Sequence, residues 1–185
     1  MERKNKVYPL AMIAVMAAVM AVVSPFALPI GPVPISLATF VVYLTVYVLG
    51  WKRATVATLV YILLGAVGMP VFSGFAGGLG KLLGPTGGYI IGYLPLALVS
   101  GLFVDKFPKS RVMQLAGMIL ATAALYALGT AWFCVEAGKT LGVALGACVI
   151  PFLPGDFAKM IVVMAVGPLI RSRLEQAGLY PKQEQ

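Results

Sequence analysis

Two charged residues stand close together in an otherwise apolar stretch near the end of the chain. Asp156 directly follows a Pro-Gly pair, and Lys159 comes three residues later, so a helix here places both side chains on one face. The helix dipole favours a carboxylate in the first turn but does not explain the lysine. A carboxylate accepts N–H hydrogen bonds, and an ammonium donates to an oxygen. The pair therefore serves either as a structural ion pair or as a site for a small polar ligand.

A glycine-rich stretch in the middle of the chain is the second unusual feature. Seven glycines lie between Ser73 and Gly88, interleaved with apolar side chains such as Phe75. Gly80 and Lys81 do not complete a phosphate-binding loop, GxxxxGK[ST], because a phenylalanine stands where the first glycine is required and a leucine follows the lysine. The stretch is interpreted either as a flexible connector or as a mobile apolar loop over a pocket.

The remaining composition limits the chemistry that is available. The chain has no histidine and six carboxylates, and its two cysteines, Cys134 and Cys148, lack the CxxC spacing of metal sites. The commonest general base and metal ligand is thus missing. The sequence predicts no catalytic residue, no metal site and no cofactor, and it disfavours an enzyme.

The elements that carry these residues have the composition of a membrane protein. Apolar residues make up 61% of the chain and charged residues 11%, and the mean hydropathy is +0.97. A soluble domain has about 45–50% apolar and about 25% charged residues. We therefore expect one all-helical integral membrane domain over residues 1–185, surrounded by lipid. The net charge of +8 then reflects loop charges that set orientation, and no nucleic-acid partner is expected.

Six apolar segments, bounded by charges or by glycine and proline clusters, are candidate transmembrane helices. The sixth contains Pro151, Pro154 and Gly155, so we expect an irregular piece or short helix up to Pro154 and then a helix from Asp156 to Ile170. The six segments cover residues 8–28, 35–49, 54–69, 88–104, 112–133 and 141–170.

Lysine and arginine predict how these helices are oriented. With six spans and a cytoplasmic N-terminus, eleven cations fall in inner segments, and only Lys81 and Lys139 fall in outer loops. The last cation, Lys159, lies within the sixth span. The sequence therefore predicts that both termini are cytoplasmic and that the glycine-rich stretch and Asp156 lie toward the outer face.

Small residues in the first span offer a close-packing surface. Ala14 and Ala18 are four residues apart, as are Ala17 and Ala21. Such small-xxx-small faces let helices approach closely. They serve either packing inside this protein or docking against a separate membrane protein.

Aromatic residues gather near the predicted outer ends of two helices. They include Tyr89, Tyr93, Trp132 and Phe133. An aromatic belt at the membrane surface is the ordinary explanation for such residues. Stacking of one or two of them on a flat ligand is the alternative.

Four motifs, in this order and spacing, resemble the BioY family, the biotin-binding S components of energy-coupling factor (ECF) transporters. The resemblance covers nearly the whole chain. The motifs are Pro32-Val-Pro-Ile-Ser-Leu37, Gly65-Ala-Val-Gly-Met-Pro-Val-Phe72, Gly84-Pro-Thr-Gly-Gly-Tyr89, and Pro151-Phe-Leu-Pro-Gly-Asp156 with Lys159. The family pattern often has threonine and glutamine where Ser36 and Ala38 stand in this chain.

The resemblance implies a prokaryotic plasma-membrane protein of six helices that binds biotin in an outward-facing pocket covered by outer loops. It implies no ATPase activity in this chain. Transport is then powered by a pair of cytoplasmic ABC-type ATPases through a membrane-embedded T component, and the S component topples to release the vitamin. The first helix is expected to contact the T component through Ala14 and Ala18, or through the register three residues later.

The resemblance also implies roles for the unusual residues. Asp156 suits the ureido N–H groups of biotin, and Lys159 suits an oxygen of the ureido group or of the carboxylate. Aromatic side chains pack the bicycle and the aliphatic chain. The predicted biotin-binding residues are Phe75, Thr86, Gly88, Tyr89, Trp132, Asp156 and Lys159.

Three other functions are compatible with parts of the sequence. An S component for thiamine or riboflavin is the nearest alternative, and the motifs around Tyr89 and Asp156 argue against it. A small membrane enzyme would need a nucleophile and a general base, and the sequence has neither a histidine nor a polar cluster to supply them. A purely structural membrane partner does not explain charged residues within an apolar span.

Overall fold

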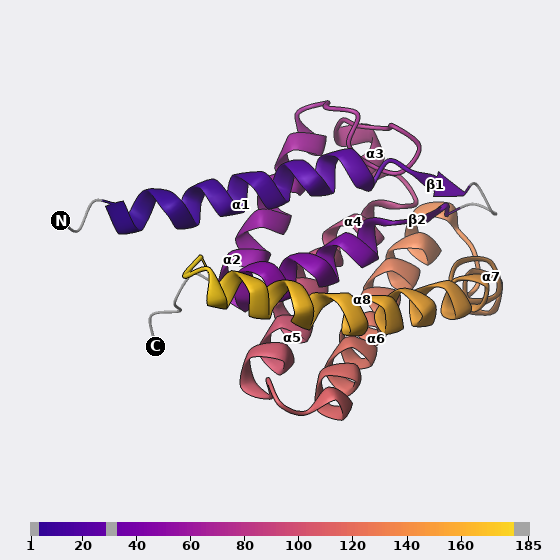
Figure 1. Cartoon of the computed structure of the whole chain (residues 1–185). Coiled ribbons are helices and arrows are strands. Elements are labelled where there is room, and N and C mark those ends of the chain that lie inside the picture. The colour runs from indigo at the N-terminus through magenta and orange to yellow at the C-terminus, as the bar shows by residue number, and fades with distance from the viewer. Residues whose placement is uncertain (1–3, 29–32, 180–185) are drawn as a thin grey trace.

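The computed structural model describes residues 4–28 and 33–179, and these residues are mostly helical (Figure 1). Predictions that involve Arg3, Pro32 or Lys182 therefore fall outside the described residues. The long helices are α1 (Lys4–Val23), α2 (Ala38–Ala66), α5 (Tyr93–Lys106), α6 (Arg111–Ala137) and α8 (Leu153–Gln176).

Four helical segments among the described residues are long and apolar enough to cross a membrane. A shorter apolar helix covers Val7–Val23. The prediction of an all-helical membrane protein is confirmed, while the orientation of the termini stays a prediction. The four segments are Ala38–Ala66, Gly87–Lys106, Arg111–Ala137 and Leu141–Gln176.

Helix α2 is broken in the middle, and the break separates the predicted second and third spans. Gly50 has a φ of 73°, a left-handed conformation that glycine adopts without steric cost. The chain changes direction here (Figure 1). The main-chain N–H of Trp51, which begins the second half, donates to Asp105 Oδ2 at 2.8 Å. A side chain from α5 thus caps the new helix start.

The predicted interruption of the last span is also present. Helix α7 (Leu141–Cys148) is followed by the 3₁₀ helix η1 (Ile150–Phe152), and α8 then begins at Leu153. This start lies before the predicted Asp156, because proline is well tolerated in the first turn of a helix and Pro154 stands there. The helix also continues past Ile170 to Gln176.

The two described ends of the chain lie together. The Tyr8 hydroxyl on α1 donates to the main-chain carbonyl of Leu179, just after α8, at 2.8 Å. Figure 1 shows the start of α1 and the end of α8 on the same side of the molecule. At the far end, the short antiparallel hairpin of β1 (Ala27–Leu28) and β2 (Ile35–Ser36) lies beside the beginning of α8.

Packing around α2 forms the core of the protein. Helices α1, α5 and α8 all contact α2, and α6 packs against α5. Tyrosines such as Tyr43, Tyr47 and Tyr61 are fully buried there. The short helix α3 (Leu79–Leu83) lies within the glycine-rich stretch, and α4 (Gly87–Ile91) begins at its end and lies directly on α6.

Candidate binding site

The first two turns of α8 bring Asp156 and Lys159 together as the sequence predicts. Lys159 Nζ lies 2.9 Å from Asp156 Oδ1, and the two side chains are only 12% and 6% exposed. An ion pair this deep in an apolar chain requires further hydrogen bonds to offset the loss of water. Those bonds come from helices α2 and α6 and from strand β2.

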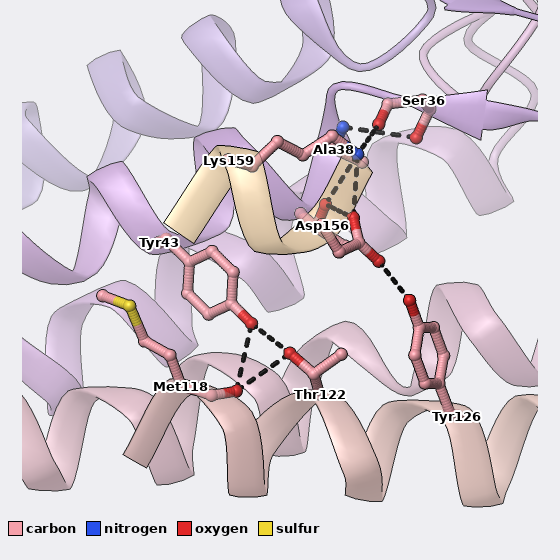
Figure 2. A network of polar contacts seen from close by, with 9 residues as sticks. Ser36, Ala38, Tyr43, Met118, Thr122, Tyr126, Asp156 and Lys159 are labelled. Carbon is pink, nitrogen blue, oxygen red and sulfur yellow. Dashed lines mark hydrogen bonds and ion pairs between the residues drawn. The ribbon is translucent and has the colours of Figure 1, made fainter. Parts of the chain in front are cut away.

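Two hydroxyl groups donate to the Asp156 carboxylate. The Thr39 hydroxyl, on α2, donates to Oδ1 at 3.0 Å. The Tyr126 hydroxyl, on α6, donates to Oδ2 at 2.6 Å, and Figure 2 shows this side chain reaching up to the carboxylate. Both oxygens of the acid are therefore held by side chains from other helices.

Lys159 uses all three of its N–H donors within the protein. Besides Asp156, its ammonium donates to the Thr39 hydroxyl at 3.2 Å and to the main-chain carbonyl of Ser36 at 2.7 Å. Ser36 ends strand β2, so the lysine links α8 to the hairpin at this end of the molecule (Figure 2). A ligand oxygen must replace one of these three acceptors to reach the ammonium.

A second layer of hydrogen bonds fixes the helix faces behind the carboxylate. The Tyr43 hydroxyl, on α2, hydrogen-bonds with the Thr122 hydroxyl, and both hydroxyls lie within hydrogen-bond distance of the main-chain carbonyl of Met118 (Figure 2). Thr122 stands one turn before Tyr126 on α6. These buried contacts hold α2 and α6 in register, and so they fix where Tyr126 meets the acid.

A small cavity lies directly against the ion pair. Its volume is about 40 Å³. The polar groups of Asp156 and Lys159 form one part of its wall, and aromatic and aliphatic side chains form most of the rest. The lining residues are Val33, Pro34, Ser36, Thr39, Tyr89, Tyr93, Leu125, Tyr126, Phe152, Asp156 and Lys159.

Three of the seven predicted binding residues line this cavity: Tyr89, Asp156 and Lys159. Tyr89 is held in place twice. Its hydroxyl lies 3.1 Å from the Thr130 hydroxyl, and its ring packs so closely on Gly129 that a Cβ atom there would overlap it. Aromatic and polar side chains of the wall therefore come from α2, α4, α5, α6 and α8.

The other four predicted residues do not line the cavity. Thr86 and Gly88 are buried just before Tyr89, and Gly88 lets α4 pack closely against Trp132. The Trp132 indole N–H donates to the Gly84 carbonyl at 3.0 Å and so ties α6 to the end of the glycine-rich stretch. Phe75 is 59% exposed.

Phe75 packs at the surface rather than at the ion pair. Its ring meets Phe26 edge-on, with centroids 5.6 Å apart. The main-chain N–H of Gly74 also donates to the Pro25 carbonyl at 2.9 Å. The glycine-rich stretch therefore lies against the segment that leads into the β hairpin.

Several residues of the cavity were not predicted from the sequence, and Thr39 and Tyr126 are the most important of them. Thr39 follows closely after the Pro-Val-Pro-Ile-Ser-Leu motif, and Tyr126 stands four residues after Thr122 in an apolar span. Polar groups at that spacing share one helix face. This pattern was the available signal for the α6 side of the site.

The small-residue face of α1 has a clear orientation. Ala14 and Ala18 are exposed, whereas Ala17 is buried against the core. The register three residues later, Ala17 and Ala21, is thus used at least in part for packing inside the protein. Ala14 and Ala18 are free to meet another membrane protein.

A buried acid and base beside a small cavity, within a bundle of apolar helices, define a membrane protein that binds a small molecule. Comparison with known proteins gives the family. The chain belongs to the BioY family, whose model matches residues 1–176. The family resemblance found in the sequence is therefore confirmed.

Curated relatives cover most of the chain. The biotin transporter BioY2 of Lactococcus lactis is 35% identical over 96% of this chain and 98% of its own length. The biotin transporter BioY of Thermotoga maritima is 39% identical over 75% of this chain and 81% of its own length. A probable biotin transporter BioY of Pyrococcus horikoshii is 35% identical, covering 92% and 98%.

A solved structure has the same fold. The crystal structure of the S-component for biotin from an ECF-type ABC transporter superposes with a TM-score of 0.84 and 28% sequence identity. The match covers 93% of this chain and 95% of that one. The predicted S-component fold is confirmed, and these relatives are transporters or transporter components, as predicted, rather than enzymes.

Proposed function

We propose that this chain is the biotin-binding S component of an ECF-type importer in the plasma membrane of a prokaryote. The observation that carries the proposal is the buried Asp156–Lys159 pair against a cavity, in a chain of the BioY family. The named relatives are biotin transporters, and the solved neighbour is an S-component for biotin.

Biotin carries groups that match both kinds of wall in this cavity. Its ureido ring offers N–H donors to Asp156 and a carbonyl oxygen to Lys159. Its carboxylate is the other group that could accept a hydrogen bond from Lys159. Its thioether bicycle and aliphatic chain suit the apolar side, where Tyr89, Tyr93 and Leu125 stand. We assign no resident cofactor or metal to the site.

The cavity must enlarge to take such a ligand. A volume of about 40 Å³ is room for a few waters, since one water needs about 10–15 Å³ on this measure. Val33, Pro34 and Ser36 form the hairpin side of the wall. Because Lys159 already donates to the Ser36 carbonyl, replacing that contact with a ligand oxygen would free the hairpin to move.

The transport partners belong to the same proposal. An ECF importer needs a membrane-embedded T component and a pair of cytoplasmic ABC ATPases, and this chain contains no phosphate-binding loop of its own. The exposed Ala14 and Ala18 on α1 form the face that would meet the T component. The excess of lysine and arginine on predicted inner segments supports cytoplasmic termini.

Calorimetric titration of purified, ligand-stripped protein with biotin tests the proposal. Thiamine and riboflavin serve as controls. One-to-one biotin binding, with the vitamin recovered unchanged, is the expected result. Absence of biotin binding by folded protein would overturn the assignment. Binding of thiamine or riboflavin instead would assign the protein to that vitamin. Chemical conversion of the ligand would favour an enzyme.

A further inference from the structure

The Thr39 hydroxyl occupies a particular place in the site because it contacts both members of the ion pair. It donates to Asp156 Oδ1 at 3.0 Å and accepts from Lys159 Nζ at 3.2 Å. Thr39 is 8% exposed and lies at the start of α2, whereas the pair lies on α8. A single hydroxyl therefore joins two helices and two opposite charges.

Counting donors and acceptors shows what this contact does to the carboxylate. A carboxylate accepts about four hydrogen bonds, two on each oxygen. Oδ1 receives two, from Thr39 and Lys159, and Oδ2 receives one, from Tyr126. Within the described part of the chain, one acceptor position thus remains, and it is on Oδ2.

Removing the Thr39 hydroxyl would leave the Lys159 ammonium with one acceptor fewer, and this favours a shift of the ammonium. Lys159 would keep its bonds to Ser36 and Asp156 but would hold one N–H without an acceptor. The second oxygen of the same carboxylate is an acceptor bonded to the same carbon as Oδ1, which the ammonium already contacts. A buried, unpaired charged donor is costly. The lysine would then bridge both oxygens and fill the position that remains on Oδ2.

We infer that Thr39 is a positioning residue of the ligand site, which confines the lysine to Oδ1 and so keeps Oδ2 open to a ligand N–H. The inference rests on the proposed function, because it assumes that the ligand presents an N–H donor, as the ureido ring of biotin does. Thr39 itself needs no contact with the ligand for this role.

Three variants of α2 test the inference. Thr39→Val removes the hydroxyl at almost constant shape, and Thr39→Ser keeps it. Thr45→Val is the matched control, because Thr45 is fully buried on the same helix and its hydroxyl donates to the Val41 carbonyl of that helix at 2.7 Å. Each purified, ligand-stripped variant is titrated with biotin, and the number of binding sites per folded molecule is recorded.

The expected result is a loss specific to the Thr39 hydroxyl. Thr39→Val should bind biotin at least about tenfold more weakly, the scale of one hydrogen bond to a charged group. Thr39→Ser should restore most of the affinity, and Thr45→Val should bind like the wild type. Equal affinity of Thr39→Val and the wild type would overturn the inference.

Infrared spectroscopy separates positioning from a general structural effect. The carboxylate stretch of Asp156 is obtained from ligand-free protein as the difference between wild type and Asp156→Asn. This band should shift in Thr39→Val and stay unchanged in Thr45→Val. Weaker binding with an unshifted band would mean that Thr39 acts only through the fold, which also overturns the inference.

The two proposals fail in different ways. If ligand-free wild type does not bind biotin at all, the proposed function is wrong and the role of Thr39 falls with it. If wild type binds biotin and Thr39→Val binds equally well, the proposed function stands and only the positioning role is wrong.

Discussion

Helix α8 carries an acid–base contact near each end, and the two differ in what surrounds them. Near its start, Lys159 pairs with Asp156 at 2.9 Å. Near its end, Arg171 pairs with Asp105 of α5 at 2.8 Å. Both pairs are largely buried, and a cavity touches each of them. Burial and charge alone therefore do not separate the proposed binding site from a structural contact.

The partners of the two carboxylates separate them. Asp105 accepts the main-chain N–H of Trp51, which begins the second half of α2, so it closes a helix start that the fold requires. Asp156 accepts from the side chains of Thr39, Tyr126 and Lys159. Side-chain hydroxyls and an ammonium can reorient when a ligand arrives, whereas a helix N-terminus cannot move without unfolding the turn.

The largest expected effect is on ligand affinity at the start of α8. Asp156→Asn and Lys159→Ala should each weaken biotin binding by about a hundredfold or more, because each leaves the other charge without its partner. Titration of ligand-stripped variants measures this loss, and circular dichroism in detergent checks that they are folded. Unchanged binding by both variants would remove the pair from the site.

The same acid-to-amide change in Asp105, the α5 partner of Arg171 near the end of α8, should act on stability instead. Asp105→Asn should lower the free energy of unfolding by about 2 kcal/mol, because it removes the charge that holds Arg171 and weakens the cap on Trp51. Folded molecules should keep their biotin affinity. Thermal unfolding in detergent and titration of the same sample give the two numbers. If Asp105→Asn lost as much biotin affinity as Asp156→Asn, the two acid–base contacts of α8 would not differ in function.

The features that the sequence predicts well are those that local rules determine. Charges are rare in apolar spans, so Asp156 and Lys159 stand out, and three-residue spacing on a helix is enough to bring them together. Proline and glycine mark breaks in the chain directly, as at Pro151–Gly155 and at Gly50, between the second and third spans. Local rules determine all of these features.

Features that depend on distant contacts could not be predicted in the same way. Thr39 lies 117 residues from Asp156 along the chain, and buried threonines in apolar helices usually bond their own helix, as Thr45 does. Phe75 has no periodic neighbours in the glycine-rich stretch, so no pattern shows which way its ring faces. Its contact with Phe26 comes from the folding of two loops together.

A third prediction concerns α1, which lies away from both acid–base contacts. Replacing Ala14 or Ala18 with leucine should reduce assembly with the T component several-fold and leave biotin binding intact, because both side chains are exposed and a bulky residue prevents close helix approach. Co-purification with the T component and ATPases measures assembly. Ala17→Leu is the informative contrast, because Ala17 is buried and should affect stability first. Normal assembly of both exposed-face variants would place the partner elsewhere.

The smallest expected effect tests the aromatic wall rather than the charges. Gly129→Ala adds a methyl group against the Tyr89 ring, whose hydroxyl is hydrogen-bonded to the Thr130 hydroxyl. Overpacking of this kind costs about 1 kcal/mol or more, so we expect biotin affinity to fall by roughly fivefold if the ring moves into the cavity. Gly146→Ala on α7 is the control, because a Cβ atom there meets open space. If both variants bind biotin as the wild type does, Tyr89 packs helices together and has no part in shaping the ligand cavity. A loss of biotin affinity confined to Gly129→Ala would extend the site from the start of α8 to the wall formed by α4 and α6.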